Sequence, residues 1–361
     1  MSAARSGRFV VTRAAAILAF LLMAPSPTAF AWDEQGHAII TELALEALPD
    51  TMPAWVRSPE VRARLIYLSA EPDRWRGQRH VQVDHINNPD HYLDVEHLAP
   101  YRLTLETLPP LRRQFTDRLA EYRALHPEEF KDSDPAKDAA YTRSVPGLLP
   151  YRIAELQWLT AASWTQYKTY EQYRDRVTDN ELRQARENII FHMGIISHFV
   201  GDATQPLHLT EHYNGWVGPN PKGYTTKKNF HALIDGGLIE QFGITADRLR
   251  RQARPPIKVS VSDDHWPELC AWLAKSHTQV EPLYALEKSG ELYQPAGRRF
   301  IEDRLLEAGA MLAGVWAASH DAAVIDEYRE KQLKARKMPA TTQPAEQPTT
   351  QPVRRAASAA P

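Results

Sequence analysis

Two pairs of a histidine and an aspartate, each four residues apart, are the side chains best suited to chemistry in this chain. His198 and Asp202 form the first pair, and His231 and Asp235 repeat its spacing. On a helix, residues four apart project from the same face, so each pair can offer an imidazole nitrogen and a carboxylate oxygen to one ligand. His208 follows the first pair, and a proline two residues before it would end the helix and could turn His208 back toward that face. These donors suit zinc and predict a metal site, although hydrogen-bonded polar pairs in a core would leave the same spacing.

The first 31 residues have the pattern of a secretory signal peptide. Three arginines precede a short apolar run, and the segment ends in Ala29-Phe30-Ala31. The apolar run is too short to span a bilayer comfortably, so we expect cleavage after Ala31 and a secreted or periplasmic protein. Cleavage would make Trp32 the first residue, and its free amine and carbonyl could then chelate a metal. His37 could add a third donor, or it could simply cap the helix that follows.

The elements that must position these residues are helical. Apolar residues recur at helical spacing within residues 39–45, 148–167, 181–200, 230–242, 266–286 and 299–331, with proline-rich joints between them. Residues 32–336 are therefore expected to form a single compact multi-helix domain, an all-α fold with long loops. Residues 337–361 are rich in proline, threonine, glutamine and alanine, which predicts a disordered tail.

Charge and cysteine content restrict the possibilities further. The chain has 43 basic and 45 acidic residues, which argues against a protein that coats nucleic acid by its net charge. Cys270 is the only cysteine, so no disulfide can form within the chain. The fold must then be held by its core and possibly by metal.

Taken together, these motifs resemble the trinuclear-zinc superfamily that joins the single-strand nucleases of fungi and plants with bacterial zinc-dependent phospholipase C. The chain has W-x4-H at residues 32–37, GDATQPLH at 201–208 and FHALID at 230–235 in the family's order. The resemblance covers about residues 32–325. It implies two further ligands, Asp73 within EPDRWR and His91 within HYLD, while His85 stays the strongest rival to His91, with His80 and His97 also nearby.

The resemblance implies three zinc ions at the centre of the helical domain. The ligand sets would be Asp73, His91, His198 and Asp202 for one ion; His208, His231 and Asp235 for the second; and Trp32, His37 and Asp202 for the third. Asp94 would orient the attacking water, and Arg76 would hold a phosphate oxygen. Each of these last two residues could instead be part of a surface ion pair.

The implied function is that of a zinc-dependent phosphodiesterase, an endonuclease that hydrolyses single-stranded DNA and RNA with metal-activated water. Tyr92 stands where the nucleases tend to carry an aromatic residue, and Trp216 lies in an aromatic loop, so both are expected to stack on bases. That loop could equally be a partly buried structural element. Two alternatives stay open, a phospholipase C that acts on phosphatidylcholine-type lipids and a zinc-stabilised binding protein without catalysis. No protein partner is implied.

Overall fold

The computed structural model describes residues 32–76, 80–130, 134, 136–142, 145–262 and 265–337. The expected signal peptide and residues 338–361 of the expected tail lie outside these ranges. The division into signal peptide, domain and tail therefore stays a prediction. None of the described helices is both long enough and apolar enough to cross a membrane.

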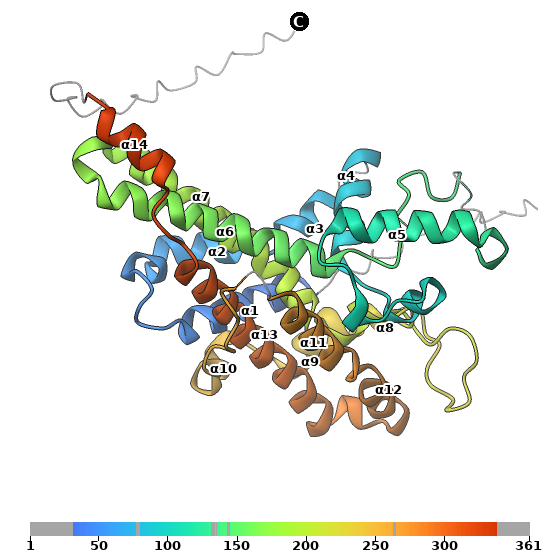
Figure 1. Ribbon diagram of the computed structural model, residues 1–361. Coiled ribbons are helices and arrows are strands. Elements are labelled where there is room, and N and C mark those ends of the chain that lie inside the picture. The colour runs from blue at the N-terminus through green and yellow to red at the C-terminus, as the bar shows by residue number, and fades with distance from the viewer. Residues whose placement is uncertain are drawn as a thin grey trace, which may run out of the picture.

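The described part of the chain is all-α, which confirms the predicted fold class (Figure 1). Its only β pairing is one isolated bridge, between Leu93 and Gly147. The α-helices are α1 (Glu34–Ala47), α2 (Pro59–Ser69), α3 (Glu71–Arg76), α4 (Val81–Asn87), α5 (Arg112–Leu125), α6 (Leu149–Gln172), α7 (Asp179–Asp202), α8 (Phe230–Ala232), α9 (Leu238–Phe242), α10 (Ala246–Leu249), α11 (Trp266–His277), α12 (Val280–Ser289), α13 (Pro295–Asp321) and α14 (Glu327–Ala335).

Helix α7 lies at the centre of the fold, and its sequence explains both of its ends. Thr178 and Glu181 form a reciprocal capping box that starts the helix. The last two turns, which carry His198 and Asp202, are buried. Helix α7 packs along α6 and α2, while α1 packs along α13. Its contact with α2 is close enough to require a glycine, because a Cβ at Gly194 would lie 2.4 Å from Leu68 Cβ.

Short turns beside this bundle carry the other candidate ligands. His91 ends the 3-10 turn Asn88–His91, and His208 lies in the 3-10 turn Pro206–Leu209. The π-helical turn Leu233–Gly237 joins α8 to α9 and carries Asp235. These short turns thus bring His91, His208 and Asp235 to the end of α7, which carries His198 and Asp202.

The structure also corrects several expected helices. The helix expected at residues 266–286 is two helices, α11 and α12, with a break at residues 278 and 279. The helix expected at residues 299–331 is broken after Asp321 into α13 and α14. Helices α2 to α5 were not predicted, because they are short or strongly polar. Helix α5, for example, buries only Phe115, Leu119 and Tyr122.

Candidate metal centre

Three groups of buried donor side chains lie at the end of helix α7. They are His37, His198 and Asp202; Asp73, His91 and His198; and His208, His231 and Asp235. Within each group the candidate ligand atoms all lie within 4.8 Å of one another. The first two groups share His198. The structure therefore brings together every side chain that the sequence resemblance assigned to a metal, from α1, α3, α7, α8 and the turns between them.

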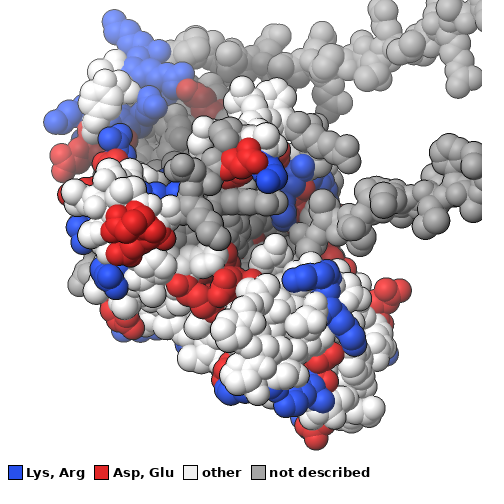
Figure 2. Space-filling model, turned by 90° about the vertical axis from the view of Figure 1, so that its right-hand side faces the viewer, with Lys and Arg blue, Asp and Glu red and all other residues white. Residues whose placement is uncertain are grey.

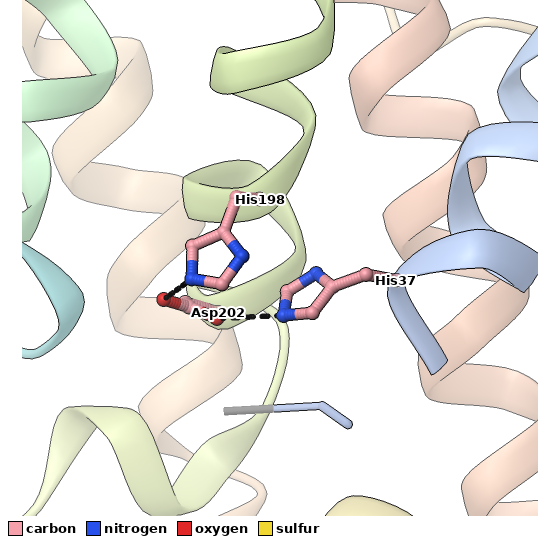
Figure 3. Close-up of side chains that lie close together, drawn as sticks. All are labelled: His37, His198 and Asp202. Atoms are coloured by element: carbon pink, nitrogen blue, oxygen red, sulfur yellow. Dashed lines mark ion pairs between the residues drawn. The ribbon is translucent and has the colours of Figure 1, made fainter. Parts of the chain in front are cut away.

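Asp202 lies between two histidines that come from different helices. Its Oδ1 is 3.5 Å from Nε2 of His37, and its Oδ2 is 3.5 Å from Nε2 of His198 (Figure 3). Each of the two carboxylate oxygens thus faces a different imidazole. This is the arrangement that a ligand bridging two cations requires.

The donor spacings match those around a small tetrahedral cation. Four ligands about 2.0–2.1 Å from zinc lie roughly 3.3–3.4 Å from one another. Nε2 of His91 is 3.6 Å from Oδ1 of Asp73. In the third group, Nε2 of His231 is 3.0 Å from Nε2 of His208 and 3.4 Å from Oδ2 of Asp235. These three distances agree with the zinc geometry to within a few tenths of an ångström, whereas Nε2 of His198 lies 3.9 Å from Oδ1 of Asp73.

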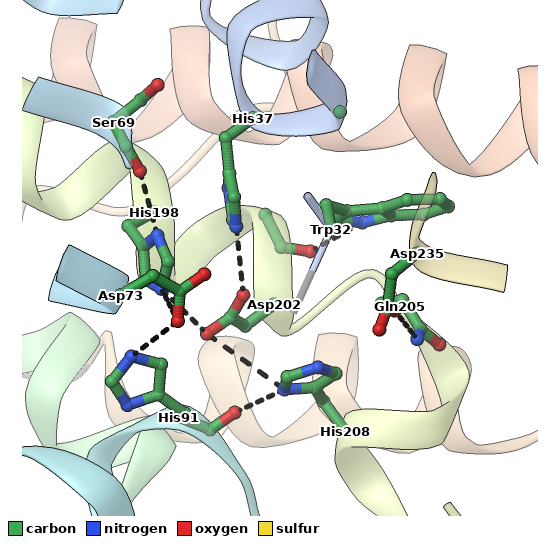
Figure 4. Close-up of polar contacts among 12 residues, drawn as sticks. Trp32, His37, Ser69, Asp73, His91, His198, Asp202, Gln205, His208 and Asp235 are labelled. Atoms are coloured by element: carbon green, nitrogen blue, oxygen red, sulfur yellow. Dashed lines mark hydrogen bonds and ion pairs between the residues drawn. The ribbon is translucent and has the colours of Figure 1, made fainter. Parts of the chain in front are cut away.

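Hydrogen bonds to backbone carbonyls orient three of the imidazoles, and Figure 4 shows those of His198 and His208. Nδ1 of His91 donates to Asn87 O at 2.7 Å, and Nδ1 of His198 donates to Ser69 O at 2.8 Å. Nδ1 of His208 donates to the carbonyl of His91 at 2.6 Å. A carbonyl can only accept, so in each ring Nδ1 carries the proton and Nε2 offers its lone pair to the centre.

A buried glutamine fixes the ligand in the π-helical turn in the same way. Nε2 of Gln205 donates to Oδ1 of Asp235 at 2.7 Å, and its own carbonyl oxygen accepts from the backbone N–H of Leu207 at 2.6 Å. Oδ2 of Asp235 is left to face His231. The sequence reasoning did not single out Gln205, although it stands inside the central motif.

Several atoms that face the centre have no hydrogen-bond partner among the described residues. This holds for Nε2 of His37, His91 and His198, for both carboxylate oxygens of Asp202 and for Oδ2 of Asp235. A buried polar atom without a partner costs about 1–3 kcal/mol, so six at one place indicate a site that can hold a ligand. Imidazole nitrogens and carboxylate oxygens are donors that zinc accepts, and the residues present fit it.

Burial shifts the titration of these groups strongly. It lowers the pKa of His198 and of His208 to about 3, which keeps both rings neutral and able to bind a cation. Burial, followed by the charges of Asp73 and other carboxylates, raises the pKa of Asp202 well above its ordinary value. A buried carboxylate of this kind is stabilised by a cation beside it.

Trp32 lies beside the first donor group. Its side chain is fully buried, and its indole Nε1 donates to the carbonyl of Gly201 at 3.1 Å. Figure 4 shows it next to Asp202. The carboxylate of Asp33 then caps α1 by accepting from the N–H of Gly36 at 2.9 Å. The start of the described chain is thus anchored at the centre, whereas the role of a Trp32 amine stays a prediction.

A cavity of about 580 Å³ opens onto the ligands. Three ligands form part of its wall, and the rest is contributed by polar and aromatic side chains. The lining residues are Arg76, Asn88, His91, Tyr92, Asp94, His97, Thr142, Val145, Leu207, His208, Tyr213 and His231. Asp94, Arg76 and Tyr92, which the sequence pointed to as catalytic or substrate-binding, all belong to this wall.

The three expected site residues on this wall differ in environment. Burial, opposed by His97, raises the pKa of Asp94 to about 7. Nη1 of Arg76 lies 3.3 Å from Oδ1 of Asp73, so its positive charge is held directly beside a candidate ligand. The hydroxyl of Tyr92 donates to Thr142 O at 2.8 Å, which fixes its ring at the wall.

Trp216 occupies a different place from the one expected. Its ring stacks on His212 with centroids 3.8 Å apart, and its Nε1 donates to the carbonyl of Pro219 at 3.0 Å. It is absent from the described lining of the cavity, where Tyr213 stands instead, half exposed and 5.6 Å from the ring of His231. The sequence marked this loop as aromatic but could not show which ring faces the cavity.

The rival histidines are placed outside the donor groups. His85 is exposed, and its Nδ1 is hydrogen-bonded to the carbonyl of Ala140 at 2.7 Å. His80 is exposed at the start of α4, and His97 lies at the rim of the cavity. Of the described candidates, His91 is the histidine that joins Asp73 and His198.

Charge on the surface is mixed. Figure 2 shows a face on which acidic side chains gather near the middle and basic ones lie mostly toward the edges. In the loop after His208, Lys222 pairs with Glu281 at 2.7 Å and Lys227 with Glu287 at 3.6 Å. Both of these lysines are therefore paired with carboxylates of α12.

Comparison with known proteins finds a protein family and a relative that each match part of this chain. Residues 160–319 match the S1/P1 nuclease family. That range includes His198, Asp202, His208, His231 and Asp235. Endonuclease 2 of Arabidopsis thaliana is 24% identical over 233 residues, which cover 62% of this chain and 61% of the relative, so the match spans about three fifths of the relative's length. The remaining donors, His37, Asp73 and His91, precede the family match and are joined to it by the fold. The family match and the relative together support a relation of this chain to the S1/P1 nucleases.

Proposed function

We propose that the protein is a secreted or periplasmic zinc-dependent endonuclease that hydrolyses single-stranded DNA and RNA. The observation that carries the proposal is the set of three donor groups whose unpaired atoms converge beside a cavity lined by aromatic side chains. The match to the S1/P1 nuclease family and the similarity to a protein named as an endonuclease support a nuclease.

The residues that would hold three zinc ions are the three donor groups described above, with the amine and carbonyl of Trp32 completing the group of His37 and Asp202. Zinc with an open coordination position lowers the pKa of a bound water toward neutrality and polarises phosphate oxygens. The carbonyls of Asn87, Ser69 and His91 keep the imidazoles oriented for this purpose.

Two residues of the wall would act on the reacting groups themselves. Asp94 can accept the proton of the attacking water, since a general base works best when its pKa lies near the operating pH. Arg76 can hold a non-bridging phosphate oxygen, because its guanidinium is positioned at the cavity beside Asp73.

Preference for single strands would follow from the depth of the centre. All the candidate ligand side chains are buried, so a phosphate must enter the cavity to meet them. A flexible strand can do so while a neighbouring base stacks on Tyr92 or Tyr213, and such stacking contributes about 1–3 kcal/mol per base. A duplex keeps its bases paired and its backbone stiff, which opposes this entry.

The proposal is tested by comparing rates on three substrates with zinc present. We expect single-stranded DNA to be cut faster than duplex DNA, and short-chain phosphatidylcholine to be hydrolysed slowly or not at all. Tyr92→Ala should raise KM for single-stranded DNA, whereas Tyr328→Ala, at an exposed tyrosine on α14, is the matched control and should not. Faster hydrolysis of the lipid than of DNA would reject the nuclease assignment.

The third zinc site depends on where the mature chain begins. We expect Trp32 at the N-terminus, because Ala29-Phe30-Ala31 is a cleavage pattern and Trp32 is buried beside Asp202. Intact mass of the exported protein measures this directly. A mature chain that starts a few residues earlier or later would leave only two complete donor groups.

A further inference from the structure

His97 lies between two carboxylates at the rim of the cavity. Its Nδ1 is 3.5 Å from Oδ2 of Asp94, and its Nε2 is 3.2 Å from Oε2 of Glu211. Both ring nitrogens thus face an acid, and the side chain is about half exposed to solvent at 49%. His97 belongs to none of the three donor groups, so its place in the site needs another explanation.

The far end of this chain of contacts is itself fixed. The backbone N–H of Glu211 donates to Oε2 of Glu96 at 3.1 Å. Oε1 of Glu96 accepts from Thr210 at 2.7 Å and lies 3.2 Å from Nε2 of His277 on α11. Burial would raise the pKa of Glu96, yet the hydrogen bonds from His277 and Thr210 lower it to about 2. The backbone of Glu211 is therefore held by the ionised carboxylate of Glu96, which His277 of α11 contacts in turn.

We infer that His97 is a positioning residue for Asp94, and that the Asp94–His97–Glu211 chain holds the Asp94 carboxylate against the wall of the cavity. The inference rests on the proposed function for the role of Asp94 as a proton acceptor. The local backbone supports the same arrangement, because the N–H of His97 donates to the carbonyl of Asp94 at 2.9 Å. His97 itself would touch neither the substrate nor the reacting atoms.

The electrostatics of Asp94 agree with this geometry. Burial is the largest influence and raises its pKa, His97 opposes it, and the charges of Glu96 and Glu211 add to the rise. Among these groups, His97 is the one that favours the ionised form of Asp94. The charged or titratable groups around Asp94 are His97 and Glu96 on its own turn, Glu211 from the segment after His208, and Tyr92, Tyr213 and Arg76 along the cavity wall.

The test compares three proteins, the wild type, His97→Gln and His97→Lys. Glutamine is neutral and lysine carries a positive charge, and a half-exposed position tolerates both residues. The carboxyl carbon of Asp94 is followed by NMR as the pH is raised, in zinc-loaded protein with labelled aspartate, and Asp94→Asn identifies the resonance. We expect the midpoint of Asp94 to rise by about 0.5–1 pH unit in His97→Gln and to return to the wild-type value or below in His97→Lys.

Activity supplies a second readout. The acidic limb of the pH profile for single-stranded DNA cleavage should move upward with the Asp94 midpoint in His97→Gln, so that one unit below the wild-type midpoint the rate falls about 3–10-fold. An unshifted Asp94 midpoint in His97→Gln would overturn the inference, and so would an equal rise in His97→Lys. If no variant, nor the wild type, cleaves DNA, the proposed function fails while the NMR comparison still decides the role of His97.

Discussion

Removing the charge of Asp202 is expected to change the stability of the protein in opposite directions with and without metal. Asp202 is fully buried, and neither of its oxygens has a hydrogen-bond partner among the described residues. With zinc bound, the two oxygens would serve the ion of His37 and the ion of His198. Without metal, the same carboxylate is buried near Asp73 and Asp235, which strongly disfavours its charged form. Asp202→Asn keeps the shape and removes the charge.

The size of the effect follows from the number of donor groups involved. A ligand at 100 times its Kd stabilises the folded state by about 2.7 kcal/mol, so impaired binding at two groups costs about 5 kcal/mol. Unfolding roughly 300 residues has an entropy of about 0.6 kcal/mol/K, which converts this loss into a Tm lower by about 8–9 °C. Without metal, relief of the unpaired carboxylate should stabilise the variant by about 1–3 kcal/mol and raise Tm by roughly 2–5 °C.

The raised pKa of Asp202 also determines how the stability of the metal-free protein changes with pH. The pKa of Asp202 in the folded state is raised well above 3.8 by burial, so the metal-free folded state holds this proton after the unfolded state has lost it. Stability of the metal-free wild type should therefore fall as the pH rises above about 4, and less steeply in Asp202→Asn.

Thermal scans with saturating zinc and after chelation measure all of these changes. The matched control is Asp50→Asn, because Asp50 is an exposed residue that lies outside the three donor groups. A variant that is equally destabilised with and without zinc would refute the reasoning, because Asp202 would then act as an ordinary structural residue. So would a variant whose Tm does not change in zinc.

Three further outcomes are expected. Elemental analysis of the mature protein should find about three zinc ions per chain, and a count of one or none would exclude the cluster. Gln205→Leu should weaken zinc binding about 10–100-fold at the group of His208, because it removes the hydrogen bond that orients Asp235. Competition with a chelating dye measures this change, and equal weakening at all three groups would contradict a local role for Gln205. Trp216→Ala should lower Tm through the lost stack on His212 and leave KM for single-stranded DNA within about twofold, whereas a large rise in KM would restore the base-stacking role first expected for Trp216.

The local pattern of the sequence determined the parts of the site that lie on one element. The spacing of His198 and Asp202 places both on one face of α7, and Thr178 with Glu181 starts that helix, so these positions follow from helical geometry alone. The helical periodicity of the buried segments was sufficient to predict an all-α fold. Helical periodicity was not sufficient to predict α5, because this helix is mostly polar and buries only a narrow apolar stripe.

Positions that depend on contacts between distant segments could be settled only by the tertiary structure. The family resemblance favours His91 over its rival His85, and the packing of the Asn88–His91 turn against α7 brings His91 to Asp73 and His198. The tertiary structure also decided between Tyr213 and Trp216, because the sequence of their loop does not determine which of the two rings faces the cavity. The sequence thus determined which residues can bind metal, since donor chemistry and helical spacing are local properties. The tertiary structure decided how they are grouped and which side chains surround them, because those relations depend on how separate helices pack.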